Sequence, residues 1–184
     1  MNKLVIDFQG YRNLISKICH DISNSNWKPD YVVGLTRGGL LPAVMISHYL
    51  DVPCETLKIC LRDHSVAESN CWMAQDAIGY VPLEDRKQHG GFHHIEMLKK
   101  NILIVDDIND TGATLNWLIT DWAKSVAGTD ATWDNVWNHN VRFAVVVDNL
   151  SSDCAVKMDY CGMEVNKDEN DVWVDFPYEE WWAK

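Results

Sequence analysis

The chain has 184 residues, of which 47% are hydrophobic, and this suits a single domain over residues 1–184 with a sizeable core. A formal net charge of −11 at pH 7 argues against nucleic-acid partners, because phosphates repel such a surface and no basic run offsets it. The N-terminal segment lacks the apolar run of a signal peptide, and no stretch is long enough to span a membrane. Six cysteines without a C-x-x-C pair fit reduced thiols, so we expect a cytoplasmic protein without a membrane partner.

The first third of the chain alternates helical and strand patterns. Apolar residues at helical spacing predict an amphipathic helix at residues 11–23, and a short apolar run predicts a buried strand at 31–36. A glycine-containing loop follows, and the apolar run after Pro42 predicts a helix with this proline near its first turn. Residues 52–61 have the pattern of another strand.

The rest of the chain contains one irregular segment and two clear strands. Residues 62–99 are polar and long for a plain connection, which favours a lid or a functional insert. A strand at 101–107 precedes a helix at 114–125. Residues 128–140 are typical of a loop or a short irregular helix, and an almost continuously apolar run predicts a strand at 141–149.

Alternating strands and helices predict an α/β fold with a mostly parallel central sheet flanked by helices. Apolar runs without alternation fit strands that are covered on both faces. Ligands bind such sheets at the carboxyl ends of the strands, where this chain has two glycine-containing turns, at 36–39 and 109–114. We therefore expect the functional site at that edge of the sheet.

Residues 102–114, ILIVDDINDTGAT, join a strand, an acidic pair and a turn that leads into a helix. Backbone N–H groups at such a turn point together and form an anion site, to which threonine hydroxyls can add donors. Gly112 permits the close approach of a phosphate. The carboxylates of Asp106 and Asp107 cannot bind phosphate, but they can accept hydrogen bonds from sugar hydroxyls. The run therefore suits a ribose 5-phosphate.

The same run resembles, without a gap, the 5-phosphoribosyl-1-pyrophosphate motif of type I phosphoribosyltransferases. The resemblance implies a Rossmann-like sheet with a small hood and a mobile lid, here at 62–99. It also implies that Asp106 and Asp107 bind the ribose 2- and 3-hydroxyls, and that Asp110 takes the proton from the base. The turn that holds the 5-phosphate is then Asp110, Thr111, Gly112, Ala113 and Thr114.

The segment LTRGGLLP, at 35–42, follows the first strand of the sheet. Arg37 is a forked, permanently charged donor suited to phosphate oxygens, and the glycines after it allow close approach. The segment resembles the pyrophosphate-binding loop of bacterial xanthine-guanine phosphoribosyltransferases and their archaeal 6-oxopurine (hypoxanthine/guanine) relatives, in which the peptide before the arginine is often cis. The resemblance implies a pyrophosphate site at Thr36, Arg37 and Gly38.

Residues 171–182, DVWVDFPYEEWW, resemble the base-binding segment of the same enzymes, which reads tryptophan, aliphatic, two residues, proline, aromatic, acid. The resemblance implies that Trp173 stacks on the base and that the backbone of Val174 reads the ring edge. It also implies that Glu179 meets the metal or the pyrophosphate. The hood of the base site is then expected within residues 150–184.

The chain departs from the 6-oxopurine pattern at one position. Those enzymes place a lysine after the strand that precedes the base pocket, and its ammonium donates to the purine O6. Asp148 and Asn149 occupy the aligned positions here, and an ionised Asp148 would repel O6. Asn149 can donate through its amide, Lys157 can substitute by another route, or Asp148 can accept from a 6-amino group. Asp148 is therefore a candidate base contact, and the identity of the base is open.

These patterns predict a purine phosphoribosyltransferase that uses hypoxanthine, guanine or xanthine in purine salvage. Mg²⁺ is implied because a pyrophosphate leaving group needs charge neutralisation, and the candidate ligands are Asp106, Asp107 and Glu179, partly through the substrate. The alternatives are a phosphoribosyltransferase for another base, such as adenine or a pyrimidine, and a non-catalytic regulator of the same fold. The expected partners are small molecules, and the resemblance implies a homodimer or homotetramer.

Overall fold

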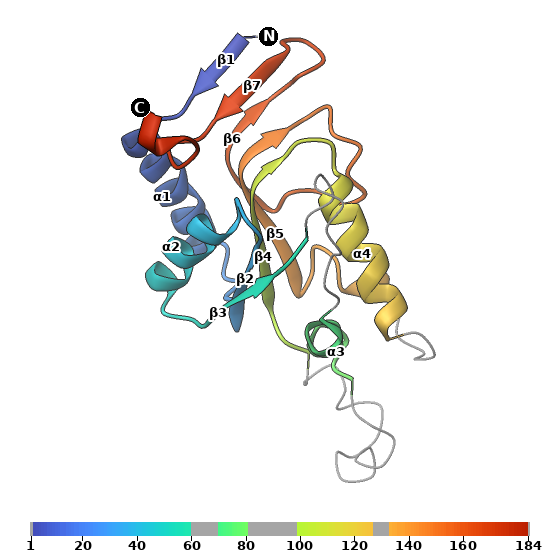
Figure 1. The fold of residues 1–184 in the computed structure, drawn as a ribbon. Helices are drawn as coiled ribbons and strands as arrows, with labels where there is room; N and C mark the ends of the chain where they lie inside the picture. Colours follow the sequence, from blue (N-terminus) through green and yellow to red (C-terminus); the bar gives the residue numbers. More distant parts are fainter. Residues whose placement is uncertain (1, 60–69, 81–98, 127–132, 184) are drawn as a thin grey trace, which may run out of the picture.

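A computed structural model describes residues 2–59, 70–80, 99–126 and 133–183. Its main feature is a five-stranded, fully parallel sheet in the order β3–β2–β4–β5–β6 (Figure 1). The strands are β2 (Tyr31–Leu35), β3 (Cys54–Leu57), β4 (Ile102–Asn109), β5 (Val141–Asn149) and β6 (Tyr160–Val165). Because all five run the same way, their carboxyl ends lie along one edge of the sheet.

The central strands are apolar along most of their length because both faces of the sheet are covered. Side chains alternate between the two faces of a strand, so Val32 and Leu103 enter one core while Val33 and Ile104 enter the other. All four are at most 1% exposed. This two-sided burial explains why the strand sequences show no polar alternation.

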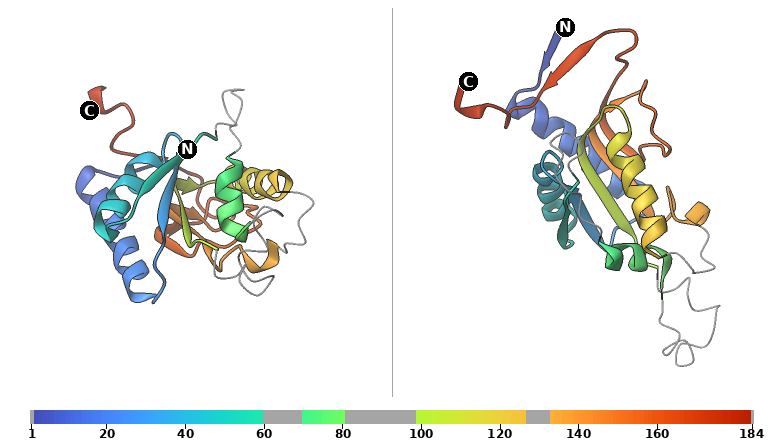
Figure 2. Two further views of the ribbon diagram at one scale, coloured as in Figure 1. Left: turned by 90° about the horizontal axis from the view of Figure 1, so that it is seen from below. Right: turned by 45° about the vertical axis from the view of Figure 1, so that its right-hand side comes forward.

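Among the described residues, two helices cover each face of the sheet. α1 (Phe8–Asn24) and α2 (Leu40–Leu50) lie on one face, and α3 (Cys71–Ile78) and α4 (Ala113–Ser125) lie on the other (Figure 2). α1 begins where the Asp7 carboxylate accepts a hydrogen bond from the Gly10 N–H at 2.6 Å. The buried stripe of α1 comprises Tyr11, Ile15, Ile18, Cys19 and Ile22.

A second, two-stranded parallel sheet joins segments from near the two ends of the chain. β1 (Asn2–Val5) pairs with β7 (Val172–Asp175) in a register that sets Lys3 opposite Trp173. Figure 1 shows this pair beyond the carboxyl ends of the central strands. It lies where the resemblance implies a hood, whereas β6, within the expected hood range of 150–184, belongs to the central sheet. The extent of the hood stays a prediction.

The predicted order of strands and helices in the central domain is confirmed, with shifted ends. The strand expected at 141–149 coincides with β5, whereas the strand expected at 52–61 is shortened to β3. The sequence patterns do not predict β1, β6, β7 or α3. Two short 3-10 turns, η3 (Trp133–Asn135) and η4 (Trp181–Ala183), complete the described elements.

The expected lid at 62–99 lies largely outside the described residues, which include only 70–80 and 99 from that range. Within 70–80 the chain forms α3, whose buried Met73 and Ala77 pack on the same face of the sheet as α4. A lid function for 62–99 stays a prediction. Among the described helices, none has both the length and the apolar character that a membrane span requires.

Candidate active site

The turn between β4 and α4 has the geometry of an anion site. Gly112 precedes the helix with a φ of +82°, a left-handed conformation that glycine adopts without a steric penalty. A Cβ on Gly112 would lie 2.7 Å from the Cα of Cys154, so the turn also has no space for a side chain. The first turn of α4 leaves backbone N–H groups without intrahelical acceptors. These groups lie where the sequence predicts the 5-phosphate.

Two asparagines connect this turn by hydrogen bonds to the chain after β5. The Asn116 amide donates to the Asp153 carbonyl at 2.7 Å, and its oxygen accepts from the Ala155 N–H at 2.8 Å. The Asn109 amide donates to the Ser152 hydroxyl at 2.8 Å. The shape of the turn therefore depends on residues 152–155 as well as on β4 and α4.

The acidic pair lies within β4, and the Asp107 carboxylate already accepts a hydrogen bond from a hydroxyl group of the protein. The Tyr178 hydroxyl donates to the Asp107 carboxylate at 2.8 Å. Burial, and after it the charge of Asp107, raise the pKa of both Tyr178 and Tyr11 far above the usual phenol value, so both hydroxyls stay protonated. Asp106 is half-buried beside this group and accepts from the Asp107 N–H at 2.9 Å. Asp107 thus acts toward Tyr178 as it is expected to act toward a ribose hydroxyl.

The loop after β2 packs directly against the acidic pair. The peptide bond between Thr36 and Arg37 is cis, in agreement with the resemblance. A Cβ on Gly38 would overlap the Asp107 carboxylate, and a Cβ on Gly39 would overlap the carbonyl oxygen of Val105. The predicted pyrophosphate loop and the predicted ribose site, which are distant in sequence, therefore form one surface.

Asp110 is held by a residue for which the sequence gives no prediction. Lys167, two residues beyond β6, donates from its ammonium to the Asp110 carboxylate at 2.6 Å. Asn149 holds both partners: its amide donates to the Asp110 carbonyl at 2.8 Å, and its oxygen accepts from the Lys167 N–H at 3.0 Å. Asn149 is 5% exposed. The candidate proton acceptor is thus half-buried and fixed in a polar network.

Asp148 faces a different partner. One of its carboxylate oxygens accepts from the Asn109 amide at 2.8 Å, across the β4–β5 ladder in which the two residues are paired. Burial raises the pKa of Asp148, and the charge of Glu164 adds to this effect while the bond from Asn109 opposes it. A contact between Asp148 and a base stays a prediction.

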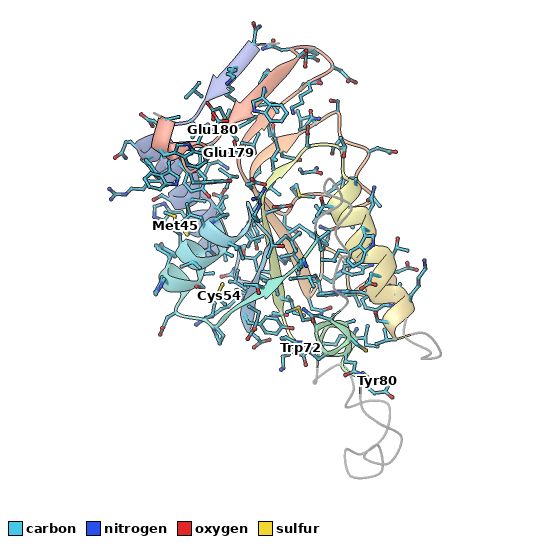
Figure 3. All side chains as sticks on the ribbon, viewed as in Figure 1. Met45, Cys54, Trp72, Tyr80, Glu179 and Glu180 are labelled. Atoms are coloured by element: carbon cyan, nitrogen blue, oxygen red, sulfur yellow. The ribbon has the colours of Figure 1, made fainter. Side chains whose placement is uncertain are left out.

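The C-terminal segment reaches the acidic pair through Tyr178 rather than through Glu179. Glu179 is exposed, and its carboxylate accepts from the Phe176 N–H at 3.2 Å. Figure 3 shows Glu179 at the end of the molecule that carries β1 and β7. Trp173 is 40% exposed on β7, and Val174 is buried. A stacking role for Trp173 and a ring-edge contact for Val174 stay predictions.

The described residues contain no group of three or more His, Cys, Asp or Glu side chains placed to hold a metal ion. Asp106, Asp107 and Glu179 accordingly do not form an all-protein metal centre. The two half-buried carboxylates of the acidic pair do suit Mg²⁺, because this ion usually takes one or two protein carboxylates together with waters and substrate phosphates.

Sequence patterns do not identify Lys167, which lies in a polar run after β6. No pattern marks β6 as a strand, so nothing shows that this run starts at the edge of the sheet. Lys157, the donor considered from the sequence, is exposed, and the Asn138 amide donates to its backbone carbonyl at 2.8 Å. Tyr178 has a signal in the sequence, since it is the aromatic before the acid in the base-binding pattern.

These features define an α/β protein with a candidate anion-binding turn at the carboxyl edge of a parallel sheet. The chain belongs to the phosphoribosyl transferase domain family, whose model matches residues 8–181. A purine phosphoribosyltransferase from Pyrococcus horikoshii Ot3 has the same fold, with a TM-score of 0.61 over 98% of this chain and 96% of that chain, at 23% sequence identity.

Curated relatives are distant in sequence and differ in name. A xanthine-guanine phosphoribosyltransferase of Cereibacter sphaeroides is 33% identical over 103 residues, which cover 55% of this chain and 52% of that protein. A bifunctional protein PyrR of Haemophilus influenzae is 25% identical over 169 residues, covering 90% of this chain and 86% of that protein. The chain spans about half to three fifths of the length of the first curated relatives that it matches.

Proposed function

We propose that the chain transfers the 5-phosphoribosyl group of phosphoribosyl pyrophosphate to a 6-oxopurine base: hypoxanthine, guanine or xanthine. One observation carries the proposal. Gly38 of the pyrophosphate loop and Tyr178 of the C-terminal segment both meet Asp107, beside the phosphate turn. These contacts support a single site in which the predicted pyrophosphate loop, the acidic pair and the C-terminal segment act together. Family membership supports the transfer, and the name of the Cereibacter relative supports a purine.

In the proposed reaction, N9 of the base forms a bond to C1 of the ribose while the bond from C1 to pyrophosphate breaks. The proton on N7 passes to the Asp110 carboxylate, which leaves the purine ring of the nucleotide neutral. The sugar gains oxocarbenium character on the way, and the carboxylates of Asp106, Asp107 and Asp110 stabilise that positive charge.

Each part of the donor substrate has a proposed binding group. The turn from Asp110 to Thr114 holds the 5-phosphate, and the acidic pair accepts the ribose hydroxyls. Residues 36–38, with Arg37 as the permanent charge, bind the pyrophosphate. Mg²⁺ held through Asp106 and Asp107 supplies charge neutralisation for the pyrophosphate when it is bound. Trp173 stacks on the base, and the backbone of Val174 reads its edge.

A different base is the second candidate, because the PyrR relative matches 90% of this chain and its name, unlike that of the Cereibacter relative, specifies no purine. Recognition of a 6-amino group by Asp148 is less favoured, because Asn109 already donates to that carboxylate. A non-catalytic regulator would have no chemical need for a carboxylate at Asp110 beside the phosphate turn.

We also propose a cytoplasmic location and a homo-oligomer. The five described cysteines are all free, which suits a reducing compartment. Trp181 and Trp182 are 66% and 73% exposed, which suits a contact between subunits. Sedimentation that detects only a monomer at micromolar concentration would contradict the oligomer.

A transfer assay tests the reaction. The protein is incubated with phosphoribosyl pyrophosphate, Mg²⁺ and, separately, hypoxanthine, guanine, xanthine, adenine, uracil or orotate, and nucleotides are separated by chromatography. We expect product with at least one 6-oxopurine, and we expect Asp110→Asn to reduce turnover by about 10²- to 10⁴-fold with little change in donor binding. Product with adenine or a pyrimidine alone would refute the base assignment. An equal loss of donor binding in the variant would refute the role of Asp110.

A further inference from the structure

The ion pair between Lys167 and Asp110 lies at the carboxyl edge of the sheet, between the phosphate turn and the strand that carries Trp173. Asp110 follows β4 directly, and Lys167 belongs to the turn that connects β6 to β7. The Lys167 and Asp110 side chains are 18% and 24% exposed. The pair is therefore shielded from bulk water but still accessible to a ligand.

The pair is also held in place rather than formed by two free side chains. Asn149 bonds the backbone of both partners, and its oxygen also accepts from the Ser151 hydroxyl at 2.9 Å. A buried amide with all of these bonds fixes the distance between the phosphate turn and the β6–β7 turn. Asn149 aligns with the lysine of the 6-oxopurine enzymes. In this chain it positions a different lysine, Lys167.

The Lys167 ammonium and the Asp110 carboxylate together complement the hydrogen-bonding groups on one edge of a 6-oxopurine. An ammonium has three N–H donors, and the structure accounts for one of them with the bond to Asp110. The site therefore offers a donor next to an acceptor. A 6-oxopurine with its ring proton on N7 offers the converse, with O6 as the acceptor and N7–H as the adjacent donor. A 6-aminopurine places a donor at the 6-position, which would face the ammonium without a bond.

We propose that Lys167 is the specificity-determining residue of the base site, donating to O6 of the base while Asp110 accepts from N7–H. This inference rests on the proposed phosphoribosyl transfer. It resolves the departure at Asp148, because the cationic donor comes from the turn after β6 instead of from the end of β5. It also assigns Lys167 a second, positioning role toward the Asp110 carboxylate.

The test compares hypoxanthine with unsubstituted purine, which lacks the 6-oxygen and the proton that hypoxanthine carries on N1. In wild type we expect kcat/KM to favour hypoxanthine. Lys167→Met should reduce kcat/KM for hypoxanthine by about 10- to 100-fold beyond any loss with purine, the range for a lost charge-assisted hydrogen bond. Binding of phosphoribosyl pyrophosphate should stay within about twofold of wild type, which also shows that the variant is folded.

Two further variants complete the design. Lys167→Arg retains a cationic donor and should restore part of the preference for hypoxanthine. Lys28→Met removes a charge from an exposed position before β2, at the opposite edge of the sheet, and should leave both bases unaffected.

The outcomes separate the two proposals. If wild type forms no nucleotide from hypoxanthine, guanine or xanthine, the proposed function fails, and this inference fails with it. If wild type uses guanine or xanthine but not hypoxanthine, the pair compared is that base and its analogue without the 6-oxygen. If wild type uses hypoxanthine and Lys167→Met slows both bases by the same factor, Lys167 acts only on Asp110 or on the fold, and this inference alone is overturned. A loss that is about 10- to 100-fold larger for hypoxanthine than for purine supports both.

Discussion

Asp148 and Asn149 are neighbours at the end of β5, yet their side chains serve different partners. Side chains alternate along a strand, so Asp148 meets Asn109 of β4 while Asn149 meets the phosphate turn and Lys167. Both residues align with the lysine of the 6-oxopurine enzymes, and both side chains form hydrogen bonds within the protein. The alignment alone therefore points to the correct region but not to the residue that supplies the charge.

Asp148→Asn should reveal the cost of burying this carboxylate. Burial raises the pKa of Asp148 above its ordinary value of 3.8. A folded-state pKa above the unfolded one means that stability falls as the pH rises through the interval between them. The asparagine keeps an oxygen for Asn109 but cannot ionise. We expect the variant to be more stable than wild type at neutral pH, with the gain shrinking as the pH falls through the raised pKa of Asp148 towards 3.8.

Urea unfolding over a series of pH values measures this difference, with the exposed Asp168→Asn as the control. A variant that is less stable than wild type at neutral pH would show that the Asp148 charge is stabilising, contrary to the direction inferred from its burial.

At the scale of elements, the loop after β2 and the end of β4 are shaped to fit each other. Gly38 and Gly39 are adjacent but face different obstacles: a carboxylate side chain in one case and a backbone carbonyl in the other. A side chain can rotate away, whereas the Val105 carbonyl belongs to the central strand of the sheet. Substitution of the two glycines by alanine should therefore have different effects.

Gly38→Ala should displace the Asp107 carboxylate and weaken donor binding, with a loss of stability below about 1 kcal/mol because a side chain can yield. Gly39→Ala should instead lower the free energy of unfolding by about 1–3 kcal/mol, since the strand backbone cannot yield. Calorimetric titration with phosphoribosyl pyrophosphate and thermal unfolding distinguish the two effects. Equal stability losses in both variants would contradict the inferred difference between the two contacts.

At the scale of the whole molecule, the sequence predicts the central sheet and the phosphate turn because these depend on local patterns. Apolar runs mark β2, β4 and β5, and the turn after β4 lies in a contiguous motif. β6 escapes prediction because Gly162 interrupts its pattern, and a Cβ there would lie 2.6 Å from the Val146 carbonyl oxygen. The pairing of β1 with β7 joins residues about 170 positions apart, which no local pattern reveals.

Those non-local features also determine which residues complete the site. Lys167 depends on the place of β6 at the edge of the sheet, and Tyr178 depends on the path of the chain after β7. Lys167 was beyond the reach of motif reading, because a side chain in a polar run gains its partner only from tertiary structure. Tyr178 lies in the base-binding pattern, but its bond to Asp107 depends on tertiary structure as well. The acidic pair, Asp110 and the loop at 36–38 could be predicted because their residues lie next to the strand ends that bring them together.

The central claim, phosphoribosyl transfer selective for a 6-oxopurine, is tested most directly by competition in one mixture. Wild-type protein is given phosphoribosyl pyrophosphate, Mg²⁺ and equal amounts of hypoxanthine, guanine, xanthine, adenine and uracil, and the initial ratio of the nucleotides reports the ratio of the kcat/KM values. We expect at least one 6-oxopurine nucleotide to exceed the adenine and uracil nucleotides by at least about a hundredfold, because a donor facing O6 leaves a 6-amino group unpaired. A mixture dominated by the adenine or uracil nucleotide, or one without nucleotide, would contradict the claim.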